Sequence, residues 1–188
     1  HLRNGDQTLN QVMAEIAGLG VKDLTVEASS LFETHAPLVR HIQNGVVTGI
    51  GTGYVTGSVA RAVSEGILPR PLRFRSHGGR PAAMQRGSAR VDIAFIAAPA
   101  ADPMGNCNGV SGPAACGSLG YAMPDAQFAR KVVVLTDHLM PYPLSPASIP
   151  ENQVDYVVEL PSIGDPKGIV SGTTRMTRDP VALTIARY

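Results

Sequence analysis

The sequence predicts an α/β domain of three layers, in which a mostly parallel sheet carries helices on both faces. Short runs rich in valine and isoleucine alternate along the chain with stretches of helical periodicity. The 188 residues, 44% hydrophobic and 16% charged, suit one well-packed domain over residues 1–188. Because strands that alternate with helices are joined by crossovers, neighbouring strands are expected to be parallel.

The first helix is expected between Asp6 and Gly20, because five apolar residues follow the spacing of one helical face: Leu9, Val12, Met13, Ile16 and Leu19. A strand, a helix, a strand and a helix should follow in chain order: Asp23–Ser29, Pro37–Gln43, Val46–Ile50 and Val59–Glu65. Proline at the start of the second helix, and glycine after both later helices, suit these ends.

The second half is expected to begin with a strand and a helix that starts at Pro81 and ends at Gly87. Its four strands are expected at Pro71–Ser76, Val91–Ala100, Lys131–Asp137 and Val154–Leu160. The apolar run Val91–Ala100 is typical of a central strand buried on both faces. A last helix is predicted at Pro180–Tyr188, with Asp179 as its cap.

Composition excludes several classes of function. The formal net charge of +1 gives no broad basic face for nonspecific nucleic-acid binding, and no apolar run is long enough to span a membrane. Cys107 and Cys116 have no paired histidine, so we expect neither a metal site nor a disulfide, and a reducing cytoplasm is the expected location. The chain starts at His1 without methionine, which we interpret as a piece of a longer polypeptide.

In parallel sheets, ligands bind beyond the carboxyl ends of the strands. Four polar loops are expected at that rim: Ala28–Ala36, Gly49–Gly57, Ser76–Arg80 and Pro99–Tyr121. The last of these is long and rich in glycine, and loops of this kind in compact domains are usually functional.

The loop Ser76–Arg80 is a candidate for binding an anionic or carbonyl-bearing ligand. Gly78 and Gly79 can bring backbone N–H groups close to a bound oxygen, and Arg80 offers a planar fork for a carboxylate. His77 can polarise a carbonyl or carry a proton near neutral pH. The alternative is a tight structural turn in which Arg80 pairs with a nearby acid.

Two further groups complete the candidate substrate-binding set. Asn106 and Asn108 flank a glycine turn with Asp102, although these residues are equally typical of a turn capped by its own side chains. Residues Gly117, Ser118 and Gly120 precede a helix, where backbone donors gather. Glycine-rich loops that converge on one rim favour binding of oxyanions and carboxylates.

The stretch Gly51–Gly57 resembles a dinucleotide-binding turn but is one residue longer than that fingerprint. Arginines 73 and 75 stand where a ribose-binding acid is needed, which argues against a nicotinamide cofactor; a phosphate-binding helix start stays open. The chain has no G-x-S-x-G nucleophile elbow, so a serine hydrolase is excluded.

Ordered blocks along nearly the whole chain resemble the citrate lyase alpha subunit family of citrate CoA-transferases. They are NGDQTLNQVMAEIAGLGVKDLTVEASSLF, HIQNGVVTGI, SHGGR, VDIAFIAAPAADPMGNCNG, CGSLGYA, PASIPENQVDYVVEL and IGDPKGI. The resemblance implies a CoA-transferase-like fold and most of the first domain of a longer two-domain chain. Gly51–Gly57 departs from the family's Thr-Ser-Gly-Leu-Arg-Gly loop, because it lacks the arginine.

The resemblance also implies an activity: citrate and an acetyl-thioester are exchanged for a citryl-thioester and acetate. The thioester is carried by a phosphoribosyl-dephospho-coenzyme A on an acyl carrier (gamma) subunit, a beta subunit cleaves the product, and the assembly is oligomeric. No cofactor is expected to be bound covalently to this chain, and no residue matches the glutamate nucleophile of the wider superfamily. Another enzyme of the superfamily, such as an acetyl-CoA hydrolase or acyl-CoA transferase, and a noncatalytic assembly domain are the alternatives.

Overall fold

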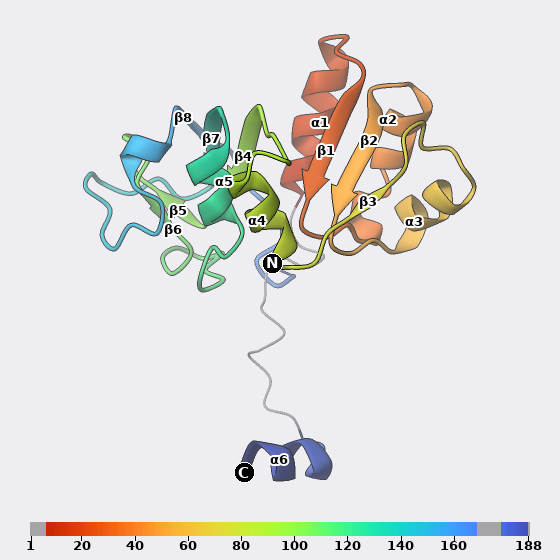
Figure 1. Cartoon of the computed structure of the whole chain (residues 1–188). Helices are drawn as coiled ribbons and strands as arrows, with labels where there is room; N and C mark the ends of the chain where they lie inside the picture. Colours follow the sequence, from red (N-terminus) through yellow and green to blue (C-terminus); the bar gives the residue numbers. More distant parts are fainter. Residues whose placement is uncertain (1–6, 169–177, 188) are drawn as a thin grey trace.

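The computed structural model of the chain describes residues 7–168 and 178–187. Its strands form two parallel sheets of three strands each, in the orders β1-β2-β3 and β4-β7-β8, and a small antiparallel pair, β5-β6. The two parallel sheets lie next to each other (Figure 1), and helices pack on both faces. The fold class is therefore the α/β arrangement that the sequence predicts, with its strands divided between two sheets.

The first half of the chain forms the first sheet and four helices. In chain order its elements are α1 (Thr8–Gly18), β1 (Leu24–Ala28), the 3-10 helix η1 (Glu33–His35), α2 (Leu38–Gln43), β2 (Val47–Thr52), α3 (Gly57–Ser64) and β3 (Arg73–Phe74). The expected strands and helices of this half are all present. Leu19, expected on the apolar face of the first helix, instead follows α1 and is exposed, because the helix has already ended at Gly18.

The second half forms the second sheet and the antiparallel pair. Its elements are α4 (Gly79–Gln85), β4 (Ile93–Ala97), β5 (Ala100–Ala101), β6 (Cys107–Asn108), α5 (Ala122–Phe128), β7 (Lys131–Thr136), the 3-10 helix η2 (Glu151–Gln153), β8 (Tyr156–Glu159) and, after a gap, α6 (Pro180–Arg187). Helix α4 begins two residues before the expected Pro81. The N–H of Val181 donates to Asp179 (3.0 Å), so Asp179 caps α6 as predicted, whereas Tyr188 lies outside the described residues.

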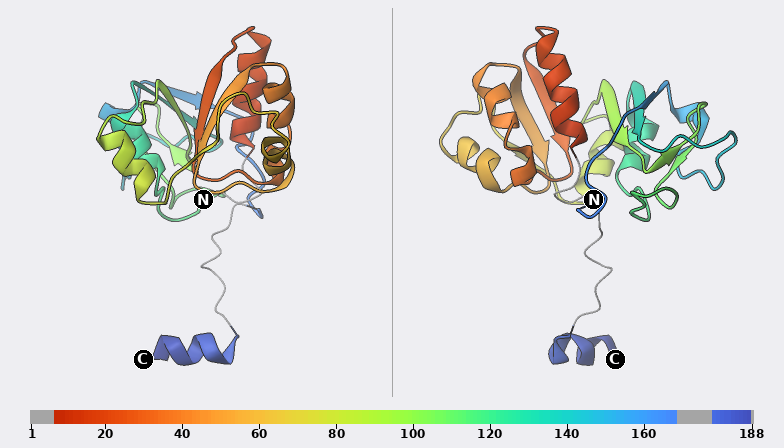
Figure 2. Two further views of the ribbon diagram at one scale, coloured as in Figure 1. Left: turned by 45° about the vertical axis from the view of Figure 1, so that its right-hand side comes forward. Right: turned by 180° about the vertical axis from the view of Figure 1, so that it is seen from behind.

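Each parallel sheet has its own hydrophobic core. Leu31, Val47, Ile50 and Val59 are buried in the first half. In the second half the buried cluster is built on Ile96, Cys107, Val132, Val134 and Ile149. The segment after β8 returns to α1, where the N–H of Gln7 donates to the carbonyl of Ile163 (3.2 Å) and joins the two halves (Figure 2).

The apolar run Val91–Ala100 is not a strand buried on both faces, and that prediction was wrong. Strand β4 covers only Ile93–Ala97, and the side chains of Ile93 and Phe95 are 50% and 40% exposed, whereas Ala94 and Ile96 are buried. The physical reason is that successive side chains point to opposite faces of the sheet: Ala94 and Ile96 pack into the core, whereas Ile93 and Phe95 lie on a face that the described residues leave partly uncovered. Among the described residues β4 also pairs with β7 alone, so one of its edges is open. Within residues 7–168 and 178–187, no helix is both long and apolar enough to cross a bilayer.

Candidate functional site

A cavity of about 250 Å³ lies at the carboxyl ends of β1 and β4. This is the position where ligands bind in open parallel sheets. Its wall combines the ends of both strands, helix α1, the loop after β1 and the glycine-rich loop before α5. The polar side chains that line it include Glu27, Ser29, His35, Arg80, Ser118 and Asp125.

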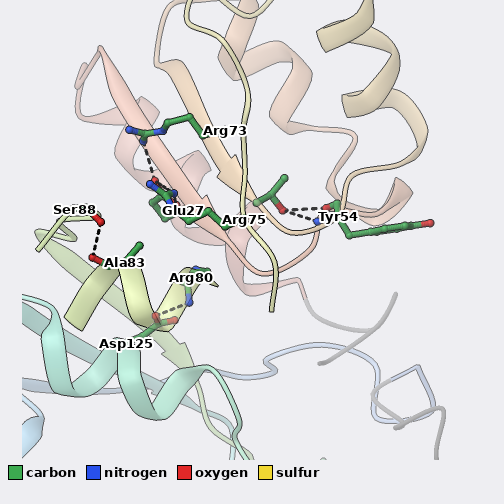
Figure 3. A network of polar contacts seen from close by, with 9 residues as sticks. Glu27, Tyr54, Arg73, Arg75, Arg80, Ala83, Ser88 and Asp125 are labelled. Carbon is green, nitrogen blue, oxygen red and sulfur yellow. Dashed lines mark hydrogen bonds and ion pairs between the residues drawn. The ribbon is translucent and has the colours of Figure 1, made fainter. Parts of the chain in front are cut away.

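Arg80 is the cation of this cavity. It lies in the first turn of α4, its side chain is only 7% exposed, and its Nη1 lies 2.7 Å from Oδ1 of Asp125 on α5 (Figure 3). The Nε of Arg80 is also buried and has no hydrogen-bond partner among the described residues. A buried guanidinium with a donor to spare can bind a carboxylate, because charge-assisted hydrogen bonds are among the stronger polar interactions.

Asp125 compensates part of the Arg80 charge. Burial raises the pKa of Asp125, Arg80 opposes this rise, and the charge of Glu27 adds to it. The pair therefore matches the alternative considered for this loop, in which Arg80 binds an acid of its own chain. Pairing with Asp125 leaves the guanidinium able to bind a further acceptor, because its Nε has no hydrogen-bond partner among the described residues.

Glu27, near the end of β1, joins the cavity to two further arginines. Its carboxylate accepts a hydrogen bond from Arg73 (2.8 Å) and from Arg75 (3.1 Å), as Figure 3 shows. Arginines 73 and 75 are the residues that argue against a nicotinamide cofactor. Both bind Glu27 of β1, across the intervening strand β2. A single carboxylate between two guanidinium groups leaves net positive charge beside the cavity.

The loop Ser76–Gly79 folds as a turn that opens α4. The N–H of Gly79 donates to Oγ of Ser76 (3.1 Å), and the N–H of Arg80 donates to the carbonyl of Ser76 (3.1 Å). The ring of His77 lies beside Tyr121, with centroids 5.4 Å apart. Gly78 stands exposed at the start of the helix. Of residues 76–80, Arg80 is the one that lines the cavity.

Asp102 organises the glycine turn that contains Asn106. The N–H groups of Met104, Gly105 and Asn106 donate to its Oδ1 at 2.9–3.1 Å, and the N–H of Leu144 donates to its Oδ2 at 2.8 Å. Burial alone would raise the pKa of Asp102, but these donors outweigh burial and lower it. The carboxylate is therefore held ionised within the fold.

Asn106 and Asn108 use their amides within the fold. Asn106 donates to Asp102 and Glu151 and accepts from the N–H of Glu151. The amide of Asn108 donates to the carbonyl of Pro146 and accepts from the N–H groups of Val110 and Ser111. Neither residue lines the cavity, and both have the contacts of a side-chain-capped turn.

The last three candidate residues lie in the segment that leads into α5. Ser118 lines the cavity. The N–H of Gly117 donates to the carbonyl of Gly109 (2.9 Å), and that of Gly120 donates to Oγ of Ser118 (3.3 Å). Both glycines have positive φ, 89° and 57°, which other residues rarely adopt. The structure thus places Ser118 and Arg80 in the wall of the same cavity, whereas the two glycines shape the turn.

The glycine-rich stretch Gly51–Gly57 does lead into a helix, but an acid of the same chain lies at the start of that helix. The N–H and the hydroxyl of Ser58 both donate to the Glu33 carboxylate (2.7 Å each). These hydrogen bonds lower the pKa of Glu33. The carboxylate thus lies where a phosphate would bind. Among the described residues, no group of three histidine, cysteine, aspartate or glutamate side chains is placed to hold a metal ion.

Most polar side chains of the cavity were missed by sequence reasoning, among them Glu27, Cys116 and Asp125. A signal existed for Glu27, because an acid inside an apolar strand pattern needs a partner, and two arginines occur in a later strand. Asp125 and Cys116 carry no such local signal. Their neighbours in space lie tens of residues away in sequence.

A family model described as "Citrate lyase, alpha subunit" matches residues 1–188. The chain belongs to the citrate lyase alpha subunit family. Within that family, the chain is 50% identical over 185 residues to the citrate lyase alpha chain of Escherichia coli K12, and 47% identical to that of Haemophilus influenzae. These matches cover 98% of this chain but 36% and 37% of the relatives, so the chain spans just over a third of their length.

Solved structures of this family and of this fold are similar to the structure of this chain. A crystal structure described as the alpha subunit of citrate lyase from Streptococcus mutans in complex with citrate has a TM-score of 0.92 and 49% identity, covering 100% of this chain and 37% of that one. Glutaconate coenzyme A-transferase from Acidaminococcus fermentans, at 17% identity, has a TM-score of 0.58 and covers 84% of this chain and 66% of its own. The predicted CoA-transferase-like fold is therefore confirmed.

Proposed function

We propose that this chain is part of a citrate CoA-transferase, the component of citrate lyase that exchanges acetyl for citryl on a carrier thioester. The observation that carries the proposal is the buried Arg80 with its unpaired Nε at a cavity of about 250 Å³, in a chain of the citrate lyase alpha subunit family. The citrate in the Streptococcus mutans relative supports a tricarboxylate as ligand.

In the exchange the carrier sulfur passes from the acetyl group to the citryl group, and an oxygen passes in the opposite direction. The acetyl carbon loses its bond to the carrier sulfur, a citrate carboxyl carbon gains one, and acetate leaves with an oxygen that citrate gives up. The substrate is the thioester of a phosphoribosyl-dephospho-coenzyme A on the acyl carrier (gamma) subunit. A beta subunit then cleaves the citryl product. These partners, an oligomeric assembly and a cytoplasmic location are part of the proposal.

In this proposal Arg80 binds a citrate carboxylate, and Ser118 and the turns around Gly78, Gly79, Gly117 and Gly120 shape the wall around it. Ser76 accepts the hydrogen bonds that fix the turn before Arg80, and His77 is part of the same turn. Asn106 and Asn108 keep the long loop folded. The group that attacks the thioester comes from outside the described residues, so we assign no catalytic residue here.

The test is an acyl-exchange assay on the full-length polypeptide with its carrier subunit. With acetylated carrier and citrate, a citryl-thioester and free acetate should appear in equal amounts, and other acids should react more slowly. Release of acetate without any new thioester would identify a hydrolase, and exchange that prefers another acid would identify a different acyl-CoA transferase. No turnover in the intact complex would leave an assembly domain.

Arg80→Lys in the same full-length protein tests the site. Loss of the planar fork should lower kcat/KM for citrate by about 1–3 kcal/mol, while KM for the acetylated carrier stays unchanged. Arg130→Lys is the matched control, because the Arg130–Asp92 pair is exposed and neither residue lines the cavity. If Arg80→Lys lowers the melting temperature and leaves citrate kinetics intact, Arg80 is structural only.

A further inference from the structure

Glu27 is a carboxylate of the candidate cavity to which the proposed binding of citrate by Arg80 assigns no role. It lies near the end of β1, its side chain is only 10% exposed, and it lines the cavity. Arg73 and Arg75 donate hydrogen bonds to it at 2.8, 3.1 and 3.3 Å. Because two guanidinium groups hold the carboxylate, a ligand that enters the cavity meets it in a defined orientation.

The Glu27 carboxylate can accept a further hydrogen bond. An ionised carboxylate has about four acceptor positions, two on each oxygen. Oε1 accepts from Nη2 of Arg73 and from Nη1 of Arg75, whereas Oε2 accepts only from Nη1 of Arg75 among the described residues. One acceptor position on Oε2 is therefore open, and buried acceptors in native proteins are normally paired with a donor.

The neighbouring strand β2 is shaped to admit this side chain. Gly51 is paired with Glu27 in the parallel register of β1 and β2. A Cβ at Gly51 would lie 2.2 Å from Oε2 of Glu27, closer than real contacts allow. Every other residue type at position 51 would thus displace the carboxylate, so its place in the cavity wall depends on this glycine.

Glu27 and Arg80 lie in the same part of the wall. Both line the candidate cavity, and both also line a second cavity of about 760 Å³ beside it. Figure 3 shows Glu27 above the ion pair of Arg80 and Asp125. The charge of Glu27 contributes, after burial, to the raised pKa of Asp125, so the two acids lie within electrostatic reach of each other.

A guanidinium and a carboxylate in one wall favour different groups of a ligand. The unpaired Nε of Arg80 suits a ligand carboxylate. The carboxylate of Glu27 repels a second anionic group but accepts a hydrogen bond from a hydroxyl. A hydroxy acid offers both groups, and citrate carries a hydroxyl group besides its carboxylates.

We propose that Glu27 is a specificity-determining residue, which accepts a hydrogen bond from the hydroxyl group of a hydroxy acid while Arg80 binds a carboxylate of the same molecule. This inference rests on the proposed function and deepens it, because it states what the site requires of its acid besides negative charge. A site that pairs a buried group with a ligand hydroxyl rejects the analogue without that hydroxyl, because the buried group is then left unpaired.

The test compares citrate with tricarballylate, the same tricarboxylate without the hydroxyl group, on the full-length polypeptide. By titration calorimetry, the parent protein should bind citrate about tenfold or more tightly than tricarballylate. In Glu27→Ala the two affinities should lie within about twofold of each other. Damage to the fold, or a change in net charge, weakens or strengthens both acids alike, so the ratio of the two affinities reports the hydroxyl contact.

Gly51→Ala gives a second variant, in which the carboxylate is displaced but not removed. It should also lower the ratio of the two affinities. Gly49→Ala is the matched control on the same strand, because a Cβ there meets Oγ1 of Thr25 at 2.9 Å, and Thr25 does not line the candidate cavity. The ratio in Gly49→Ala should equal that of the parent, and equal ratios in both glycine variants would contradict the proposal.

Two further outcomes separate this inference from the proposed function. If the acyl-exchange assay yields a citryl-thioester but Glu27→Ala keeps the preference for citrate over tricarballylate, the role of Glu27 is wrong and the proposed function stands. The same holds if Ser118→Ala, and not Glu27→Ala, abolishes the preference, because Ser118 also lines the cavity. If the parent neither binds citrate nor transfers to it, both proposals are wrong.

Discussion

The guanidinium of Arg80 and the carboxylate of Asp125 lie 2.7 Å apart on two neighbouring helices, and both side chains are largely shielded from solvent. The pair fixes α4 against α5 at the wall of the candidate site. It also makes each residue dependent on the other, because a buried charge that loses its partner is costly.

Asp125→Ala should therefore destabilise the protein by about 3–5 kcal/mol, since it leaves the Arg80 guanidinium buried without compensation. Chemical denaturation of the full-length protein measures this. The matched control is Asp92→Ala, which breaks the exposed ion pair with Arg130 and should leave the denaturation midpoint unchanged. Equal effects of the two substitutions would mean that Arg80 finds another partner.

The Glu33 cap on α3 predicts a specific cost for a methyl group at Gly57. Gly57 has a φ of 67°, and a Cβ there would lie 2.0 Å from Oε2 of Glu33. Gly66 has a similar φ, 75°, with no atom within 4 Å of a Cβ. Gly66→Ala should cost about 1–2 kcal/mol from backbone strain alone, and Gly57→Ala should cost more.

Most of the excess at Gly57 comes from displacement of the Glu33 carboxylate, so it should shrink when that carboxylate is absent. In a Glu33→Ala background, Gly57→Ala should cost less than in the parent but still more than Gly66→Ala, because the Cα and Cβ of residue 33 lie 3.2 Å from the added methyl group. Thermal or urea denaturation of the four proteins completes the comparison. An excess that is unchanged in the Glu33→Ala background would mean that the carboxylate contributes nothing to the cost.

The pKa of Asp102 predicts how one loop responds to acid. Because its folded pKa lies below the ordinary value of 3.8, ionised Asp102 stabilises the folded protein above pH 3.8, and this contribution is lost as the pH falls through the folded pKa. Asp102→Asn should therefore be less stable than the parent at pH 7, and the difference should shrink below pH 4. Urea midpoints of both proteins between pH 7 and pH 3 measure it; a constant difference contradicts the assignment.

The two cysteines should react differently in the folded protein. Cys107 is fully buried, and burial, with the charge of Asp102, raises its pKa to about 12, whereas Cys116 is half-buried and lines the candidate cavity. Iodoacetamide at pH 8 should modify Cys116 first, and both should react in urea. Cys116→Ser should abolish labelling of the folded protein, and rapid labelling of Cys107 in that variant would contradict the structure.

Most elements could be predicted from local pattern, and their assembly could not. The runs at Lys131–Thr136 and Ile93–Ala97 are rich in β-branched and aromatic residues, which favour strands, and both form strands here. Which strand pairs with which depends on contacts that no short window contains. The division into two sheets arises at the edges of β1 and β4, where the local sequence looks like that of any central strand.

The sequence predicted where in the fold a candidate site lies, but not which partners its residues have. The rim rule led to Arg80 and Ser118, which both line the cavity, because the carboxyl end of a parallel strand is fixed by topology. Asn106 has its decisive partner, Glu151, 45 residues along the chain, and Arg80 has Asp125 on another helix. Partners so far apart in the sequence leave no periodic signal, so the roles of Asn106 and Arg80 could be assigned only from the three-dimensional structure.

The glycine-rich loop carries a consequence for the order of folding. The Asp102 carboxylate in this loop accepts a hydrogen bond from the N–H of Leu144, 42 residues later. The side chain of Asn106 accepts one from the N–H of Glu151, and that of Asn108 donates one to the carbonyl of Pro146. During synthesis, the loop cannot close until residues 144–151 have left the ribosome. At about 5–20 residues per second, a growing chain spends several seconds with this wall of the cavity unfinished. The pace of translation through this stretch therefore limits how soon the loop can make its native hydrogen bonds.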